Sequence, residues 1–161
     1  FYYAALEIRF GIEARLNEYL SQTLKSFGQD SKISDYSASK LLKKLTTIDP
    51  QASHKSLIQV TNEQRGQSII WQYTPVTPRL ASIHGQLGEL LHYKFFTNNE
   101  HWYVRKPLGG NPQKSIADFL PLLREGIAEL KRATSGTLLT NPHFSEIIKA
   151  EIDSIKEASD T

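Results

Sequence analysis

Two side chains, Arg79 and His84, have the types and the spacing that could cleave RNA without a metal ion. A histidine near neutral pH can accept the proton of a ribose 2′-hydroxyl or donate a proton to the leaving oxygen. An arginine guanidinium can hold the phosphate while negative charge develops on it. The pair forms an Arg-x4-His motif and is the candidate catalytic group of the chain. The ordinary alternative is an arginine at a helix start beside a partly buried histidine.

The motif lies near the start of a helix that the sequence predicts over residues 77–96. Thr77 is a favourable N-cap, and Pro78 suits the first helical position, where its missing N–H has no partner. The apolar residues that recur at helical spacing are Leu80, Ile83, Leu87, Leu90 and Leu91. On an ideal helix, Arg79 and His84 lie about 140° apart. Their convergence therefore requires an irregular first turn or a second subunit.

A strip of small residues separates the apolar and polar faces of this predicted helix. The strip consists of Ala81, Gly85, Gly88 and His92. Two glycines inside a helix cost roughly 1 kcal/mol each relative to alanine, so their presence favours close approach of another backbone. The strip therefore predicts a homodimer interface.

A second polar group lies on the helix predicted over residues 1–26. Arg9, Glu13 and Asn17 follow one another at four-residue spacing inside its broad apolar arc. A carboxylate removed from water needs a partner, because an unpaired buried charge is costly. We expect this group to face the helix of residues 77–96 and to meet His84 or Arg79. A solvated Arg–Glu pair worth only tenths of a kcal/mol is the alternative.

Aromatic and cationic side chains gather in and just after a predicted loop over residues 97–110. They are Trp102, Tyr103, Arg105, Lys106 and Lys114. Aromatic rings can stack on unpaired bases, and cations beside a helix N-terminus attract phosphate, so this segment is a weak candidate for RNA binding. An ordinary loop whose aromatic rings seal one end of the bundle is the favoured alternative.

In Arg79, His84 and the predicted helical bundle, the sequence resembles the HEPN superfamily (higher eukaryotes and prokaryotes nucleotide-binding). Many of its members are metal-independent ribonucleases of defence and toxin systems. Their signature is an arginine, four to six residues and a histidine on a late helix, and two copies meet in a homodimer to form one cleft. A polar residue commonly follows that arginine, whereas this chain has Leu80. The resemblance implies an antiviral or toxin-type role, with RNA as substrate and Arg79 and His84 as catalytic residues.

Hydrophobic periodicity predicts a single, mainly α domain over residues 1–161, an antiparallel bundle of about five helices. The predicted helices cover residues 1–26, 35–47, 77–96, 112–133 and 141–155. Two short runs, residues 56–61 and 68–74, are rich in Ile, Val, Trp and Tyr and could pair as one inserted β-hairpin. A helical detour is the competing interpretation of these two runs.

Composition excludes several chemistries. The chain has no cysteine, which excludes disulfides, thiolate zinc sites and cysteine nucleophiles and favours a cytoplasmic protein. Its formal net charge is only +2, so bulk charge does not require a nucleic-acid partner. No apolar run is long enough for a membrane span, and the five histidines show no metal-ligand spacing. We therefore predict no metal, cofactor or membrane partner.

Two functions remain open from the sequence. The first is a metal-independent endoribonuclease of a bacterial defence or toxin type, which acts as a homodimer through Arg79 and His84. The second is a non-catalytic helical interaction or sensing module, an inactive HEPN-like domain of a larger bacterial protein. The position of these two side chains relative to a two-fold interface is the observation that best separates the two functions.

Overall fold

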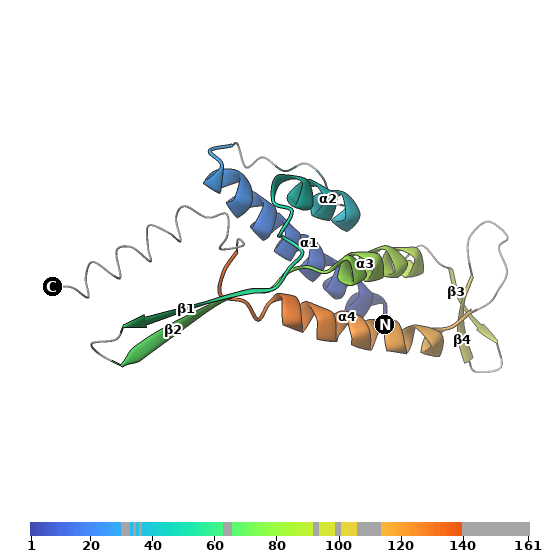
Figure 1. Cartoon of the computed structure of the whole chain (residues 1–161). Coiled ribbons are helices and arrows are strands. Elements are labelled where there is room, and N and C mark those ends of the chain that lie inside the picture. Colours follow the sequence, from blue (N-terminus) through green and yellow to red (C-terminus); the bar gives the residue numbers. More distant parts are fainter. Residues whose placement is uncertain are drawn as a thin grey trace.

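Four α-helices and two small antiparallel sheets make up the part of the chain that the computed structural model describes (Figure 1). This part comprises residues 1–29, 33, 35, 37–62, 66–91, 94–98, 101–105 and 114–139. The helices are α1 (Tyr2–Ser26), α2 (Ala38–Ile48), α3 (Pro78–Leu91) and α4 (Leu120–Ala133). The strands are β1 (Ser56–Asn62), β2 (Gln67–Tyr73), β3 (Lys94–Asn98), β4 (His101–Arg105) and β5 (Lys114–Ser115). The predicted mainly α class is confirmed, and the predicted fifth helix over residues 141–155 lies outside the described residues.

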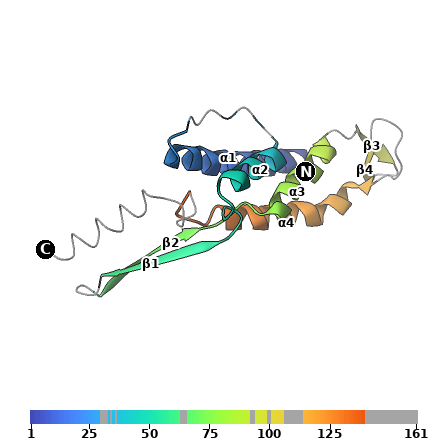
Figure 2. The same ribbon diagram turned by 45° about the horizontal axis from the view of Figure 1, so that its top comes forward.

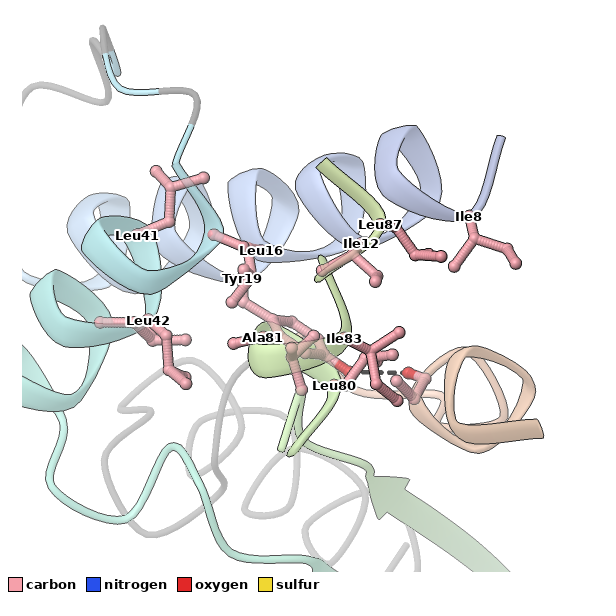
Figure 3. Packing of buried hydrophobic residues seen from close by; sticks show 14 of the residues in the cluster. Ile8, Ile12, Leu16, Tyr19, Leu41, Leu42, Leu80, Ala81, Ile83 and Leu87 are labelled. Carbon is pink, nitrogen blue, oxygen red and sulfur yellow. Dashed lines mark hydrogen bonds between the residues drawn. The ribbon is translucent and has the colours of Figure 1, made fainter. Parts of the chain in front are cut away.

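Helix α1 is the centre of the bundle, because each of the other three helices packs against it. Its apolar residues recur at helical spacing, and those that are buried are Ala5, Ile8, Ile12, Leu16, Tyr19, Leu20 and Leu24. Figure 3 labels four of them, Ile8, Ile12, Leu16 and Tyr19. They belong to one core with Leu41 and Leu42 of α2 and with Leu80, Ile83 and Leu87 of α3. Burial of each large aliphatic side chain contributes about 1.5–3 kcal/mol, so this arc holds the bundle together.

The helices are not antiparallel throughout. Contacts of Arg9 and Glu13 with His84, and of Tyr19 with Thr74, show that α1 and α3 run in opposite directions. Helix α4 runs in the same direction as α1. A Cβ added at Gly126 would meet Ile8, and one added at Gly11 would meet Leu130. The antiparallel arrangement that the sequence predicts therefore holds for α1 with α3 but not for α1 with α4.

The region between α3 and α4 differs from the prediction. Helix α3 ends at Leu91 rather than near residue 96, and β3, β4 and β5 form a three-stranded antiparallel sheet. Only β4 lies wholly in the predicted loop, whereas β3 begins in the predicted helix over residues 77–96 and β5 lies in the helix predicted over residues 112–133. Aromatic and β-branched residues such as those of the Trp102–Val104 run favour a pleated strand over a helix. Helix α4 begins at Leu120 rather than near residue 112, after a 3₁₀ turn over Ile116–Phe119. Pro121 therefore lies in the first turn of α4, where a proline is tolerated.

The predicted hairpin is confirmed. Strands β1 and β2 pair in register from Ser56 opposite Tyr73 to Asn62 opposite Gln67, and the pair projects away from the helices in both views (Figures 1 and 2). At its root, the buried Tyr73 hydroxyl donates a hydrogen bond to the Ala52 carbonyl over 2.5 Å. Burial raises the pKa of Tyr73, so this hydroxyl keeps its proton.

Candidate functional site

Three polar side chains meet between α1 and α3, and we call them the Arg9–Glu13–His84 cluster. Glu13 Oε1 lies 2.6 Å from His84 Nε2 and 3.6 Å from Arg9 Nη2. Arg9 Nε lies 3.4 Å from the same His84 nitrogen. That nitrogen cannot both donate to Glu13 and accept from Arg9, and the shorter contact assigns its proton to the hydrogen bond with Glu13. The predicted contact between Glu13 and His84 is therefore present.

The cluster lies at the margin of the core. His84 is only 6 % exposed, whereas Arg9 and Glu13 are half-buried. Arg9 and Glu13 lie one turn apart on α1, which places both side chains toward α3. The Arg9 side chain packs over Gly88, where an added Cβ would make an ordinary van der Waals contact, 3.4 Å from the Cζ and Nη1 atoms of Arg9. The chemistry available here is a carboxylate that orients an imidazole beside a guanidinium.

Asn17 does not join the cluster. Its side-chain oxygen Oδ1 is buried and has no hydrogen-bond partner among the residues that the structure describes. The expectation that all three residues would share one network therefore holds for Arg9 and Glu13 but not for Asn17.

Arg79 lies on the exposed side of α3 that faces α4. Its Nε and Nη2 atoms donate to the two carboxylate oxygens of Glu125 over 2.6 and 2.5 Å. These hydrogen bonds raise the pKa of Arg79 and lower the pKa of Glu125. Within one chain, no hydrogen bond joins Arg79 to His84, although both residues are described. The structure thus separates the two members of the Arg-x4-His motif, and sequence reasoning did not single out Glu125, which follows Arg79 by 46 residues.

Two residues of the strip of small residues, Ala81 and Gly88, pack against other parts of their own chain. Ala81 is buried in the core, and Gly88 is packed under Arg9. Gly85 is exposed, and a Cβ added there would have no neighbouring atom within 4 Å. The His92 side chain lies outside the described residues. Among the three described residues of the strip, only Gly85 therefore offers open backbone surface to a second subunit. The predicted dimer interface on this strip stays a prediction.

Replacing Gly85 with alanine is expected to raise the free energy of unfolding by roughly 0.5–1 kcal/mol. The added methyl group meets open space, and alanine is the better helix former. Gly126→Ala is the matched control, because its Cβ would stand 3.2 Å from the Ile8 and Ile83 methyl groups and should bring no gain. Urea denaturation of both variants measures the difference. A loss of stability in Gly85→Ala would show instead that another backbone packs on this position in solution.

The candidate RNA-binding residues lie mainly on the second sheet. Trp102, Tyr103 and Arg105 belong to β4, and Lys114 belongs to β5. Lys106 lies outside the described residues. Strand β4 is the central strand, paired with β3 and β5, so these residues occupy a small sheet rather than a loop.

Two surface cavities are lined by described residues alone, and neither of them is lined by a residue of the Arg9–Glu13–His84 cluster. One, of about 530 Å³, lies between α2 and α3 and is lined in part by Lys43, Thr46 and Ser82. The other, of about 280 Å³, lies where the hairpin root meets the ends of α3 and α4 and is lined in part by Lys55 and Arg132.

Known proteins do not assign a function to this chain. No family model, no curated protein and no solved structure matches this chain. Within the described ranges, no three His, Asp or Glu side chains are placed to hold a metal ion. None of the described helices is both long enough and apolar enough to cross a membrane. The functional argument therefore rests on the contacts of individual residues.

Proposed function

We propose that this chain is a non-catalytic helical interaction module, a HEPN-like bundle in which Arg79 and His84 serve the fold. The observation that carries the proposal is that both side chains are already engaged by carboxylates of their own chain. Arg79 forms two hydrogen bonds with Glu125, and His84 forms a 2.6 Å hydrogen bond with Glu13.

Catalysis by the Arg-x4-His route needs both side chains free for the RNA. The imidazole must reach a 2′-hydroxyl, and the guanidinium must reach a phosphate. His84 exposes only 6 % of its surface. Bidentate arginine–carboxylate pairs are among the stronger hydrogen-bonded pairs, so a phosphate must displace Glu125 before it can bind Arg79. Releasing His84 leaves Glu13 as a half-buried carboxylate with one partner fewer, which opposes the change.

A metal-independent endoribonuclease that acts as a homodimer is the second candidate. The arrangement of Glu13, His84 and Arg9 favours it, because a carboxylate that orients an imidazole is a common device of general-base catalysis. In this ribonuclease candidate, Arg9 supplies the cation beside His84 within one chain. Arg79 can bind the RNA phosphate only if it leaves Glu125.

A cleavage assay on single-stranded RNA separates the two candidates. For the interaction module, we expect no cleavage above background, with or without a chelator, and no difference between the wild type and His84→Gln. The endoribonuclease predicts cleavage that survives chelation, falls by roughly 10²- to 10⁴-fold in His84→Gln, and leaves 2′,3′-cyclic phosphate ends. That result would replace the proposal. Comparing Arg9→Gln with Arg79→Gln in the same assay would then identify the arginine that binds phosphate.

A further inference from the structure

The β1–β2 hairpin, which we call the arm, carries exposed aliphatic side chains on both faces. Leu57 is 55 % exposed, Ile69 is 50 % exposed and Ile70 is 53 % exposed. The register places Leu57 opposite Gln72 and Ile70 opposite Gln59 on one face. Ile69 lies on the other face, on the same side as the paired Ile58 and Trp71.

Among the described residues, none of the helices α1 to α4 covers the arm. Beyond its root, it extends away from the bundle in both views (Figures 1 and 2), and its strands pack mainly on each other in the described part of the chain. A two-stranded hairpin is only marginally stable in water when nothing packs on it. Exposed apolar side chains on both of its faces are typical of a surface that is buried in an assembly.

A second exposed apolar surface lies at the start of α1, and we call it the aromatic patch. It consists of Phe1, Tyr2, Tyr3 and Phe10. Tyr3 is 80 % exposed and Phe10 is 54 % exposed, and their seven-residue spacing places them on one line of the helix. The chain begins at the end of the bundle opposite the tip of the arm (Figures 1 and 2). The arm and the aromatic patch of one chain therefore cannot meet.

We propose that the arm docks on the aromatic patch of a second copy of this chain, and that the second copy returns the same contact. A two-fold dimer makes both contacts at once, so the arm face that carries Leu57 and Ile70 and the aromatic patch each find a partner. The buried area fits this assembly. A half-exposed aromatic side chain can still bury roughly 100 Å², so one arm and one patch lose on the order of 600 Å². Two such contacts reach about 1,200 Å², the lower end of stable specific interfaces.

This inference goes beyond the proposed function, because it holds whether or not the Arg9–Glu13–His84 cluster is catalytic. The formal net charge of +2 also opposes association only weakly. A dimer of an inactive module and a dimer of a ribonuclease give the same result in the tests below, and the RNA assay distinguishes them independently.

Sedimentation of the full chain tests whether the arm makes the dimer. The wild type should be dimeric at tens of micromolar, and Ile70→Ser should raise the dissociation constant about tenfold or more. Gln59→Ser is the matched control, because Gln59 is an exposed polar residue opposite Ile70 on the same face and should leave the dimer unchanged. A monomeric wild type, or an Ile70→Ser protein that dimerises like the control, would overturn the proposal.

Disulfide trapping tests which surface the arm meets, and the absence of native cysteine makes the result clear. Ile70→Cys and Phe10→Cys proteins should form a mixed disulfide only when the two are combined under mild oxidation. Lys44→Cys, on the exposed side of α2, should not pair with Ile70→Cys. Rapid coupling of Ile70→Cys with itself would show that arm meets arm. An Ile70→Cys thiol shielded in a monomer would show that the arm is covered within its own chain. Either outcome rejects the proposal.

Discussion

Arg15→Ala is expected to lower the free energy of unfolding by about 3 kcal/mol or more. Arg15 lies inside the buried arc of α1 and is itself buried. Its Nε atom donates to the Ala133 carbonyl at the end of α4 over 3.0 Å, and Nη1 donates to Glu18 over 3.1 Å. The guanidinium also lies 4.4 Å from the centre of the Tyr19 ring. Alanine removes these contacts together with the packing of the aliphatic stem.

Two variants sharpen the measurement of Arg15 by urea denaturation. Lys25→Ala removes an exposed cation from the same helix and should change stability by less than about 0.5 kcal/mol. Arg15→Lys keeps the charge but loses the planar fork, so it should resemble Arg15→Ala more than the wild type. Equal stabilities of Arg15→Ala and Lys25→Ala would mean that the link between α1 and α4 contributes little.

Glu13→Ala is expected to cost about 2 kcal/mol or more, because it leaves the nearly buried His84 without its hydrogen-bond acceptor. A double-mutant cycle with His84→Ala should give a coupling energy of roughly 1–3 kcal/mol, since the two side chains are in direct contact. Glu13→Gln keeps the shape and one acceptor oxygen and should lose less than Glu13→Ala.

Glu7→Ala provides the control for the cluster, because Glu7 is an exposed carboxylate on the same helix. The cluster should make the cost of Glu13→Ala clearly larger than the cost of Glu7→Ala. Similar losses in the two variants, with no coupling to His84, would reduce the cluster to surface charge and would remove the basis of the ribonuclease candidate.

The sequence predicted those features that follow from the periodicity of a single segment. The arc of α1 and the hairpin of β1 and β2 are of this kind, since spacing alone indicates which residues face a core. The contact between Glu13 and His84 was predictable as well, because a carboxylate inside an apolar arc must have a partner.

Features that depend on the choice of neighbouring helix were not predictable in the same way. Arg79 pairs with Glu125 because α4 lies beside α3, and no local pattern in either helix reports that placement. The end of α3 was also missed. The apolar residues around Phe95 and Phe96 fit a helical arc as well as they fit a strand, and pairing of β3 with β4 decides between them. Arg15 was not singled out because its buried acceptor, the Ala133 carbonyl, is a backbone atom that any sequence would supply.

The hydrogen bonds around the Ala133 carbonyl attach the root of the arm to the helices. Arg15 Nε and Thr74 Oγ1 each lie 3.0 Å from it, and the Tyr19 hydroxyl donates to the Thr74 carbonyl. The Leu138 backbone N–H donates to the Gln72 backbone carbonyl over 3.0 Å, so the segment after α4 lies along the edge of β2. The root of the arm is therefore held to α1 and to the segment after α4 at several points. We expect these hydrogen bonds to set the direction in which the arm leaves the bundle, because the arm cannot turn about its root without breaking them.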